Sequence, residues 1–200
     1  MAAGTAEPTG RRERNKQEKL ERITRAAREL FDARGVDGVT TQEVADRADV
    51  GTGTLFLYAP TKGDLLLLAQ NAAYAEALER GIARADVATE ALDGVMAIIG
   101  EVVHCNRAHV ANGRTYLREL LFGDPTTPHR IEALASTART ERAIAETIAR
   151  TTGVDATAAA TLARLANAAM LLALTSPLAA DASEDELLAL LRAQVTVLLP

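Results

Sequence analysis

Three side chains in the segment 52–58 could contact the edges of DNA bases. Threonine hydroxyls donate and accept hydrogen bonds, and the methyl groups of threonine and leucine can contact the methyl group of thymine. If the segment is helical, Thr52, Thr54 and Leu57 point outward while Leu55 points into the protein. A short helix with this pattern suits insertion into the major groove of DNA.

A helix-turn-helix would place that segment against DNA. Thr40 and Glu43 have the spacing of a capping box, in which each side chain binds a free backbone N–H of the other residue. Gly51 permits a sharp change of direction, and Pro60 disfavours helical geometry in the residue before it. The small apolar residues that would give the first of the two helices its buried face are Val44, Ala45 and Ala48.

The stretch from Thr40 to Lys62 resembles the DNA-binding signature of the TetR family of one-component transcriptional regulators. The residues that carry the resemblance are Thr40, Thr41, Val44, Ala45, Ala48, Val50, Gly53, Thr54, Leu55, Phe56, Tyr58, Lys62, Asp64 and Leu65. The resemblance implies a DNA-binding domain followed by a longer helical regulatory domain.

The resemblance also implies roles for single side chains. Thr41 and Gln42 would open the first motif helix near the groove, with Gln42 at a base- or backbone-contacting position, and Lys62 would bind a phosphate. Phe56 and Tyr58 could instead pack in the core. The positions that match the recognition helix are Thr52, Gly53, Thr54, Phe56, Leu57 and Tyr58. The positions that depart from the family pattern, where a serine-type N-cap, a polar residue and a phenylalanine are usual, are Gly51, Leu57 and Ala59.

The charge of the chain is divided unevenly, although its net value is −5. Residues 1–62 hold 11 Lys and Arg against 10 Asp and Glu, whereas residues 63–200 hold 11 against 17. Residues 11–28 hold eight basic and three acidic side chains. Because salt screens charges beyond roughly 10 Å, this local excess governs attraction to phosphate. The side chains that either bind phosphate or simply begin a solvated helix are Arg11, Arg12, Arg14 and Lys16.

The composition favours a fold made only of helices. Of the residues, 48% are hydrophobic, and most of these are Ala and Leu, which enter helices at low cost. Runs of β-branched residues with alternating polarity are absent, so a sheet is not expected. We predict an all-α fold: a three-helix helix-turn-helix DNA-binding domain plus a larger helical ligand-binding and dimerisation domain, about nine or ten helices in total.

The sequence pattern predicts a cytoplasmic protein. We find no apolar run of 18 residues and no signal-peptide pattern, and the single Cys105 cannot form an internal disulfide. Free thiols are typical of reducing compartments.

We expect the chain to divide into three segments. These are a flexible tail over residues 1–12, a helix-turn-helix domain over residues 13–62 and an all-helical regulatory and dimerisation domain over residues 63–200. A helix over residues 14–34, capped by Gly35, would cover the back of the helix-turn-helix.

Turn and cap residues divide the second half of the chain. Asn112-Gly113 is a turn candidate, although a helix could also restart there. Pro177 should close one helix, and Ser183 and Glu186 have capping-box spacing at the start of another. The helices expected after the motif cover residues 61–84, 86–111, 115–122, 128–151, 155–175 and 183–198.

The helices over 128–151 and 155–175 are rich in alanine, whose small side chain lets helices approach closely. The resemblance implies that they form a four-helix bundle with their copies in a second subunit. Alternatively, they are core helices of a monomer. One recognition helix contacts few base pairs, whereas a two-fold dimer contacts two half-sites about 34–36 Å apart. We therefore predict a homodimer on palindromic, double-stranded operator DNA.

The resemblance further implies a repressor that is released from DNA by a small-molecule effector in its helical domain, without a cofactor. The chain has no Trp, three Phe and three Tyr, so we favour an aliphatic pocket for a lipid-like or macrocyclic effector over an aromatic cage. The polar, aromatic or pliable residues predicted to line this pocket are Met96, Ile99, His104, Tyr116, Leu120, Phe122, Asn167 and Met170.

Other classes of protein find less support. His104 and Cys105 are neighbours, and neighbours on a helix do not face each other. The three histidines and Cys105 lack the spacing of metal ligands, so we expect a buried inert thiol and no metal site. No motif supports an all-α enzyme. A DNA-packaging protein would be basic throughout, unlike the acidic second half of this chain.

Overall fold

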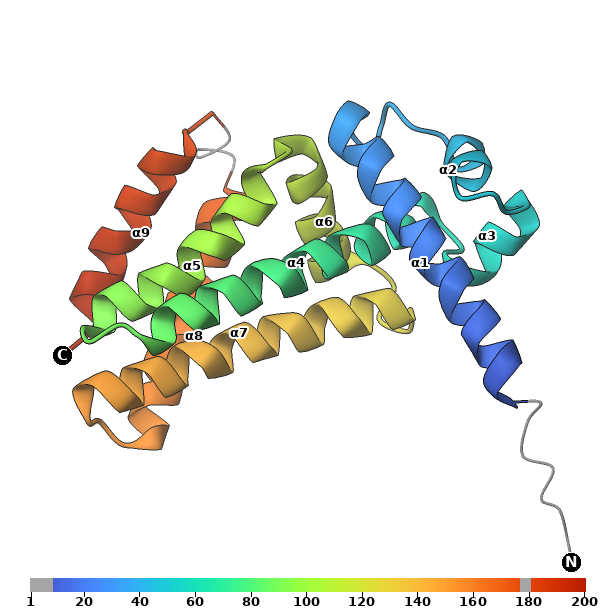
Figure 1. The fold of residues 1–200 in the computed structure, drawn as a ribbon. Helices are drawn as coiled ribbons and strands as arrows, with labels where there is room; N and C mark the ends of the chain where they lie inside the picture. Colours follow the sequence, from blue (N-terminus) through green and yellow to red (C-terminus); the bar gives the residue numbers. More distant parts are fainter. Residues whose placement is uncertain (1–8, 177–180) are drawn as a thin grey trace, which may run out of the picture.

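Every regular element in residues 9–176 and 181–200, the part of the chain that the computed structural model describes, is a helix (Figure 1). This confirms the all-α prediction. The nine helices within these residues are α1 (Thr9–Arg34), α2 (Thr41–Arg47), α3 (Thr52–Tyr58), α4 (Lys62–Asp86), α5 (Ala91–Arg107), α6 (Val110–Phe122), α7 (Pro128–Thr152), α8 (Ala156–Thr175) and α9 (Glu184–Leu198).

Helices α1, α2 and α3 pack around one small core. The predicted capping box is present, since Glu43 N–H donates to the Thr40 hydroxyl and Thr40 N–H donates to the Glu43 carboxylate. Gly35 ends α1 with a φ of 72°, which glycine adopts without steric cost. The buried residues that form this core are Ile23, Ala27, Phe31, Val36, Val39, Val44, Ala45, Ala48 and Leu55.

Helix α1 starts earlier than the sequence suggested. It begins at Thr9, so residues 9–12, which we expected in a flexible tail, are helical. The charged residues that follow support a helix, and Glu13 and Lys16 form an i,i+3 ion pair at 3.9 Å. Residues 1–8 lie outside the described residues.

The chain reverses between α2 and α3 at Asp49 rather than at Gly51. Asp49 has a φ of 53°, a left-handed conformation that aspartate tolerates better than most residues. Its carboxylate accepts a hydrogen bond from Arg22 of α1 at 3.1 Å, which anchors the turn. Gly51 has a φ of −69° and is the N-cap of α3. Because glycine has no side chain, α3 lacks a side-chain hydrogen bond at its N-cap.

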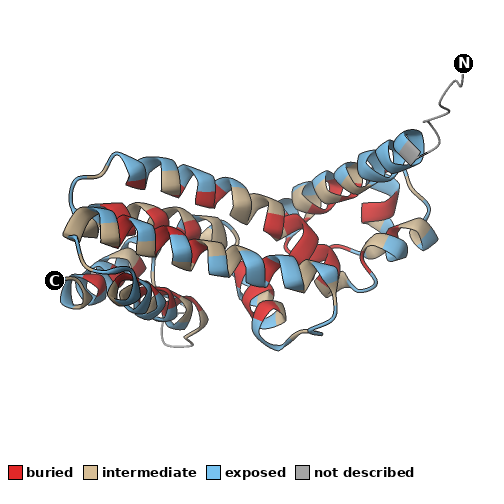
Figure 2. Cartoon of the chain, turned by 90° about the horizontal axis from the view of Figure 1, so that it is seen from below, coloured by how far each residue is buried: buried red, intermediate tan, exposed pale blue. Residues whose placement is uncertain are grey.

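Helix α4 connects the three-helix core of α1–α3 to a larger half that it forms with α5–α9, and it runs through the centre of that half (Figure 1). Thr61 and Asp64 cap its first turn reciprocally. It packs against α5 and α7, while α9 packs against α5 and α8. Figure 2 shows that the buried residues face inward along the long helices. Those of α4 include Leu65, Leu66, Leu67, Leu68, Ala69, Ala77 and Leu78.

The helix that we expected over residues 86–111 is interrupted. α5 ends at Arg107, and α6 starts at Val110 after His109, whose Nδ1 accepts from Asn112 N–H at 3.4 Å. Asn112-Gly113 is therefore not a turn but lies in the first turn of α6, which agrees with the alternative that a helix restarts there. A Cβ on Gly113 would lie 2.1 Å from a backbone oxygen of α5, so the glycine permits this close junction.

Helices α7 and α8 form a hairpin. Gly153 ends α7 with a φ of 73°, and Asp155 caps α8 by accepting from two backbone N–H groups at 2.9 Å. By length and composition α8 could cross a membrane, contrary to our expectation of no such run, but core helices pass the same test.

The capping box of Ser183 and Glu186 is confirmed at α9. Pro177, expected to close α8, lies outside the described residues.

Candidate nucleic-acid interface

Helix α3 lies at the surface and leaves one of its sides free. Leu57 is 84% exposed while Leu55 is fully buried, which agrees with the orientation expected from the sequence. Thr52 and Thr54 are half-buried on the same helix. Phe56 is 43% exposed, so this ring is not a core residue in the free protein. The free side of α3 thus presents hydroxyls, methyl groups and one aromatic ring.

Hydrogen bonds join the exposed edges of α2 and α3. The Thr52 hydroxyl donates to Gln42 Oε1 at 2.7 Å, and Gln42 Nε2 donates to Asp46 Oδ1 at 2.7 Å. Thr41, at the start of α2, and Gly53, on α3, lie beside this pair, and a Cβ on Gly53 would meet nothing within 4 Å. The structure therefore brings together residues from both motif helices that the sequence placed at one surface.

Ion pairs hold α2 in place against α1. Arg34 donates to Glu43 at 2.8 Å, and Arg47 donates to Glu29 at 2.7 Å. The hydrogen bond from the Thr40 backbone, followed by that from Arg34, lowers the pKa of Glu43 from its usual 4.5 to about 2. This carboxylate stays ionised through the neutral and mildly acidic range and fixes the start of α2.

Basic side chains extend from α3 along the free end of α1. The Tyr58 hydroxyl, at the last residue of α3, donates to the carbonyl of Lys16 at 3.3 Å. Beyond that contact α1 projects past the three-helix core (Figure 1). Lys62 is half-buried in the first turn of α4, directly after the motif. The exposed basic residues on this end of α1 are Arg11, Arg12, Arg14, Lys16 and Lys19.

Residues 23–69, which span the helix-turn-helix, match the profile of the bacterial regulatory proteins of the tetR family. The structure of Thermus thermophilus FadR, a TetR family transcriptional repressor in complex with lauroyl-CoA, is similar over 90% of this chain and 92% of that chain, with a TM-score of 0.64 and 26% identity. This chain therefore carries the DNA-binding domain of the TetR family of regulators.

Two structures from Rhodococcus sp. RHA1 share the fold of this regulator. One is a TetR transcriptional regulator with a TM-score of 0.59 and 19% identity, over 92% of this chain and 97% of that chain. The other has a TM-score of 0.68 and 18% identity, over 90% and 96%. No curated protein sequence matches the regulator.

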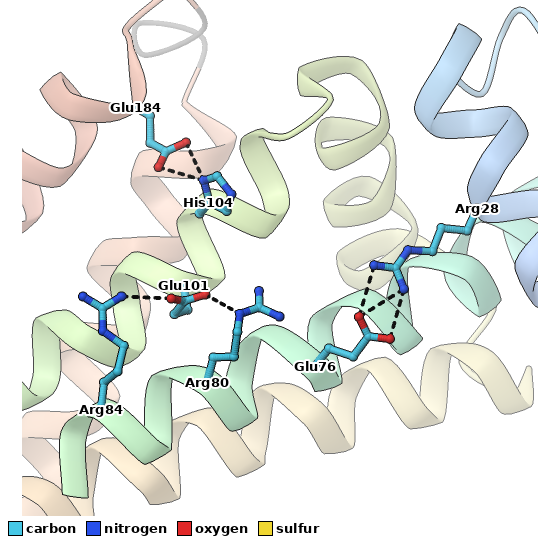
Figure 3. A network of polar contacts seen from close by, with 7 residues as sticks. All are labelled: Arg28, Glu76, Arg80, Arg84, Glu101, His104 and Glu184. Carbon is cyan, nitrogen blue, oxygen red and sulfur yellow. Dashed lines mark hydrogen bonds and ion pairs between the residues drawn. The ribbon is translucent and has the colours of Figure 1, made fainter. Parts of the chain in front are cut away.

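Two sets of contacts attach α1 to the larger half of the regulator. Arg28 of α1 forms a two-pronged ion pair with Glu76 of α4, with distances of 3.0 and 3.1 Å (Figure 3). Asn112 of α6 is fully buried at the end of α1, where its Nδ2 donates to the Phe31 carbonyl at 2.9 Å. Its Oδ1 accepts from Val36 N–H at 2.7 Å. Helices α4 and α6 therefore both hold the DNA-binding helices directly.

The residues predicted for an effector pocket of the regulator are spread over three places. Met96 and His104 line a groove of about 530 Å³ between α5 and α9. Phe122 is 82% exposed at the end of α6, apart from that groove. Those buried in the helical core are Ile99, Tyr116, Leu120, Asn167 and Met170.

Sequence reasoning missed three polar side chains of the core, Asn71, Tyr74 and Thr140, which lie near the predicted Tyr116. Tyr74 stacks on Tyr116 with ring centres 6.5 Å apart, and its hydroxyl lies 2.7 Å from that of Thr140. Burial raises the pKa of Tyr74 to about 12. The Oδ1 of Asn167 is buried without a partner in the described structure. Asn71, three residues before Tyr74 on a leucine-rich helix, was the signal that could have revealed this polar core.

Cys105 of the regulator has the environment of a structural thiol. Burial raises the pKa of this thiol to about 11, so the reactive thiolate is scarce at neutral pH. His104, its neighbour, is exposed and pairs with Glu184 of α9 at 3.1 Å (Figure 3). Within residues 9–176 and 181–200, no three His, Cys, Asp or Glu side chains are grouped to hold a metal ion.

Proposed function

We propose that this TetR-family regulator is a cytoplasmic repressor. It binds a palindromic operator as a homodimer and leaves it when a small-molecule effector binds in its helical C-terminal domain. Residues 9–62 form the DNA-binding domain, because α1 begins at Thr9, and residues 63–200 form the regulatory and dimerisation domain. The observation that carries the proposal is the free side of α3, where Leu57 is 84% exposed beside the basic end of α1. Phe56 and Leu57 are exposed next to each other and, unlike the isolated Val197, they lie near the basic residues of α1, which favours an anionic partner surface.

Base contacts come from α3 and phosphate contacts from the basic residues around it. Thr52 and Thr54 offer hydroxyls, Leu57 offers methyl groups, and Gly53 lets the backbone approach DNA closely. Lys62 neutralises a phosphate and makes binding sensitive to salt. The proposed DNA-binding residues are Thr41, Gln42, Thr52, Gly53, Thr54, Phe56, Leu57, Tyr58 and Lys62.

The homodimer forms through α7 and α8. On α8, Leu172 is 70% exposed and Leu165 is 48% exposed, seven residues apart and so on one face. On α7, Ile131 is 54% exposed and Leu134 is 43% exposed. Helices α7 and α8 form one hairpin, and such a set of exposed aliphatic side chains supports an interface with a second copy.

The effector is lipid-like. Two observations support this class: the similar structure of Thermus thermophilus FadR holds lauroyl-CoA, and the core of this chain is aliphatic with few polar groups. Among those groups, the Asn167 oxygen lacks a partner in the described structure and can accept a hydrogen bond. The effector therefore combines an alkyl chain with a hydrogen-bond donor, and lauroyl-CoA is the first probe.

A gel-shift assay tests DNA binding. The protein should retard the DNA upstream of its own gene more strongly than a shuffled fragment of equal length. Leu57→Glu should abolish this preference. The matched control is Val197→Glu, which changes an 85% exposed apolar residue of α9 and should leave binding unchanged. Equal retardation of both DNA fragments by the unchanged protein would contradict operator recognition.

Effector response is tested in the same assay by titrating lauroyl-CoA. Release of the specific DNA, with no release by free coenzyme A, supports a lipid-like effector. Retention of the DNA at saturating lauroyl-CoA, as judged by direct binding of the ligand, would contradict release by this class of molecule.

A further inference from the structure

The C-terminal end of α3 is bonded to α7, which lies far from it in sequence. His129, the second residue of α7, places Nε2 2.7 Å from the backbone oxygen of Tyr58, the last residue of α3. A carbonyl oxygen only accepts, so Nε2 carries the proton and donates it. The last carbonyl groups of a helix have no partner within the helix, and this histidine supplies one.

His129 is in turn bonded from inside the regulatory core. Asn71 of α4 is 2% exposed, and its Nδ2 donates to the backbone oxygen of His129 at 2.8 Å and to Glu132 at 3.3 Å. The Oδ1 of Asn71 accepts from the hydroxyl of Tyr116 at 3.1 Å. Tyr116 is 3% exposed and stacks on Tyr74. A continuous series of contacts therefore runs from the stacked tyrosines to the end of α3.

We propose that Tyr116, Asn71 and His129 form a polar relay that positions α3 from the regulatory core, in parallel with the linkage through α4. His129 is a positioning residue: it bonds the end of α3 from the regulatory half. An effector that moves Tyr116 breaks its bond to Asn71, and the rearranged Asn71 releases His129 and the end of α3. The meaning of the relay rests on the proposed function, but its existence is tested without DNA or effector.

The burial of Asn71 and Tyr116 makes the relay sensitive to the loss of either side chain. Without the Tyr116 hydroxyl, the Asn71 oxygen is left buried and unpaired, which favours a different position of its amide. The contacts of Asn112 with the end of α1 do not include this path, because they reach Phe31 and Val36 rather than α3. The relay and the α1 attachment can therefore be changed separately.

Hydrogen exchange of the full-length protein, read by mass spectrometry on peptides covering residues 52–60, tests the relay. His129→Ala should raise exchange there about three- to tenfold, the factor that one net hydrogen bond contributes. His129→Gln, which keeps an N–H donor, should restore part of the protection. Thr196→Ala removes a similar side-chain bond on the exposed surface of α9 and serves as the control.

The decisive comparison is between two backgrounds. Tyr116→Phe keeps the stacked ring but removes the hydroxyl, and it should raise exchange at residues 52–60 several-fold in the otherwise unchanged protein. In the His129→Ala background the same change should add less than about twofold, because the relay is already broken. Non-additivity of this kind would not arise from two independent losses of stability.

Three results would overturn the proposal. These are unchanged exchange at residues 52–60 in His129→Ala, an equal effect of Tyr116→Phe in both backgrounds, and a uniform rise in all helices. If His129→Ala does not fold, Tyr116→Phe alone decides: a local rise at residues 52–60 supports the relay and no rise refutes it. A failed gel shift with a confirmed exchange pattern would reject the proposed function and leave the relay standing.

Discussion

Replacing Asn112 by alanine should weaken the attachment of the DNA-binding helices to the larger half of the molecule. The Asn112 side chain is fully buried and makes two hydrogen bonds across this junction. The two partners do not lose equally. The Phe31 carbonyl keeps a second donor, Gly35 N–H at 2.8 Å, whereas Val36 N–H would be left buried without its acceptor.

The magnitude follows from this asymmetry. Loss of the bond to Phe31 costs about 1 kcal/mol, and the unpaired Val36 N–H costs about 1–3 kcal/mol, so Asn112→Ala should destabilise the protein by about 2–4 kcal/mol. For a chain of this length each kcal/mol lowers Tm by about 2–4 °C, which predicts a fall of about 5–15 °C. Urea unfolding followed by circular dichroism and calorimetry measure both quantities.

The matched control is Asn106→Ala. Asn106 lies beside the same junction, but its Nδ2 donates one long hydrogen bond, 3.3 Å, to the carbonyl of Gly113 within the larger half. It should cost clearly less than Asn112→Ala. If the two variants had equal stability, or if Asn112→Ala lost under 0.5 kcal/mol — less than about half of one net hydrogen bond — the bonds at the end of α1 would not hold the two halves together.

Three further changes probe the other surfaces. Lys62→Ala should weaken binding to all DNA sequences and reduce the slope of log K (the DNA-binding constant) against log salt concentration by about 1; an unchanged slope would contradict the phosphate contact. Thr54→Ala should instead alter the preference among operator variants. Leu172→Glu should convert the proposed dimer to a monomer in sedimentation analysis, and Val197→Glu should not. A dimer that survives the first change does not use this face of α8. Because the pKa of Glu43 falls to about 2 on folding, its contribution to stability is present above pH 4.5 and is lost as the pH falls toward 2. Glu43→Gln should therefore reduce the loss of unfolding free energy between pH 4.5 and 2, as measured by urea unfolding.

Short-range sequence patterns were sufficient to predict most helix boundaries in the motif and the start of α9. The capping boxes at Thr40 and Ser183 were read from spacing alone, since each involves only residues three apart. The outward position of Leu57 and the inward position of Leu55 followed from helical periodicity. These features depend on short-range geometry, which the sequence contains directly.

Features that depend on distant partners were not predictable in the same way. The break between α5 and α6 was missed because His109 is an uncommon N-cap residue. Asn112 suggested a turn because asparagine favours turns, but contacts with residues 76 and 81 positions away keep it in a helix. Asn71, Tyr116 and His129 meet only after α4, α6 and α7 have packed, so no local pattern predicts that these three residues bond to one another.

The length of α3 has a consequence for protein engineering. A helix of seven residues is too short to be stable alone, and its N-cap is a glycine without a side-chain bond. Its last carbonyl is bonded by His129, which lies 71 positions further along the chain. A chimera that joins this DNA-binding domain to another regulatory domain at residue 62 would leave that carbonyl facing a foreign side chain. The transferable unit is therefore the segment to residue 62 together with the histidine of α7 and the asparagine of α6 that hold it.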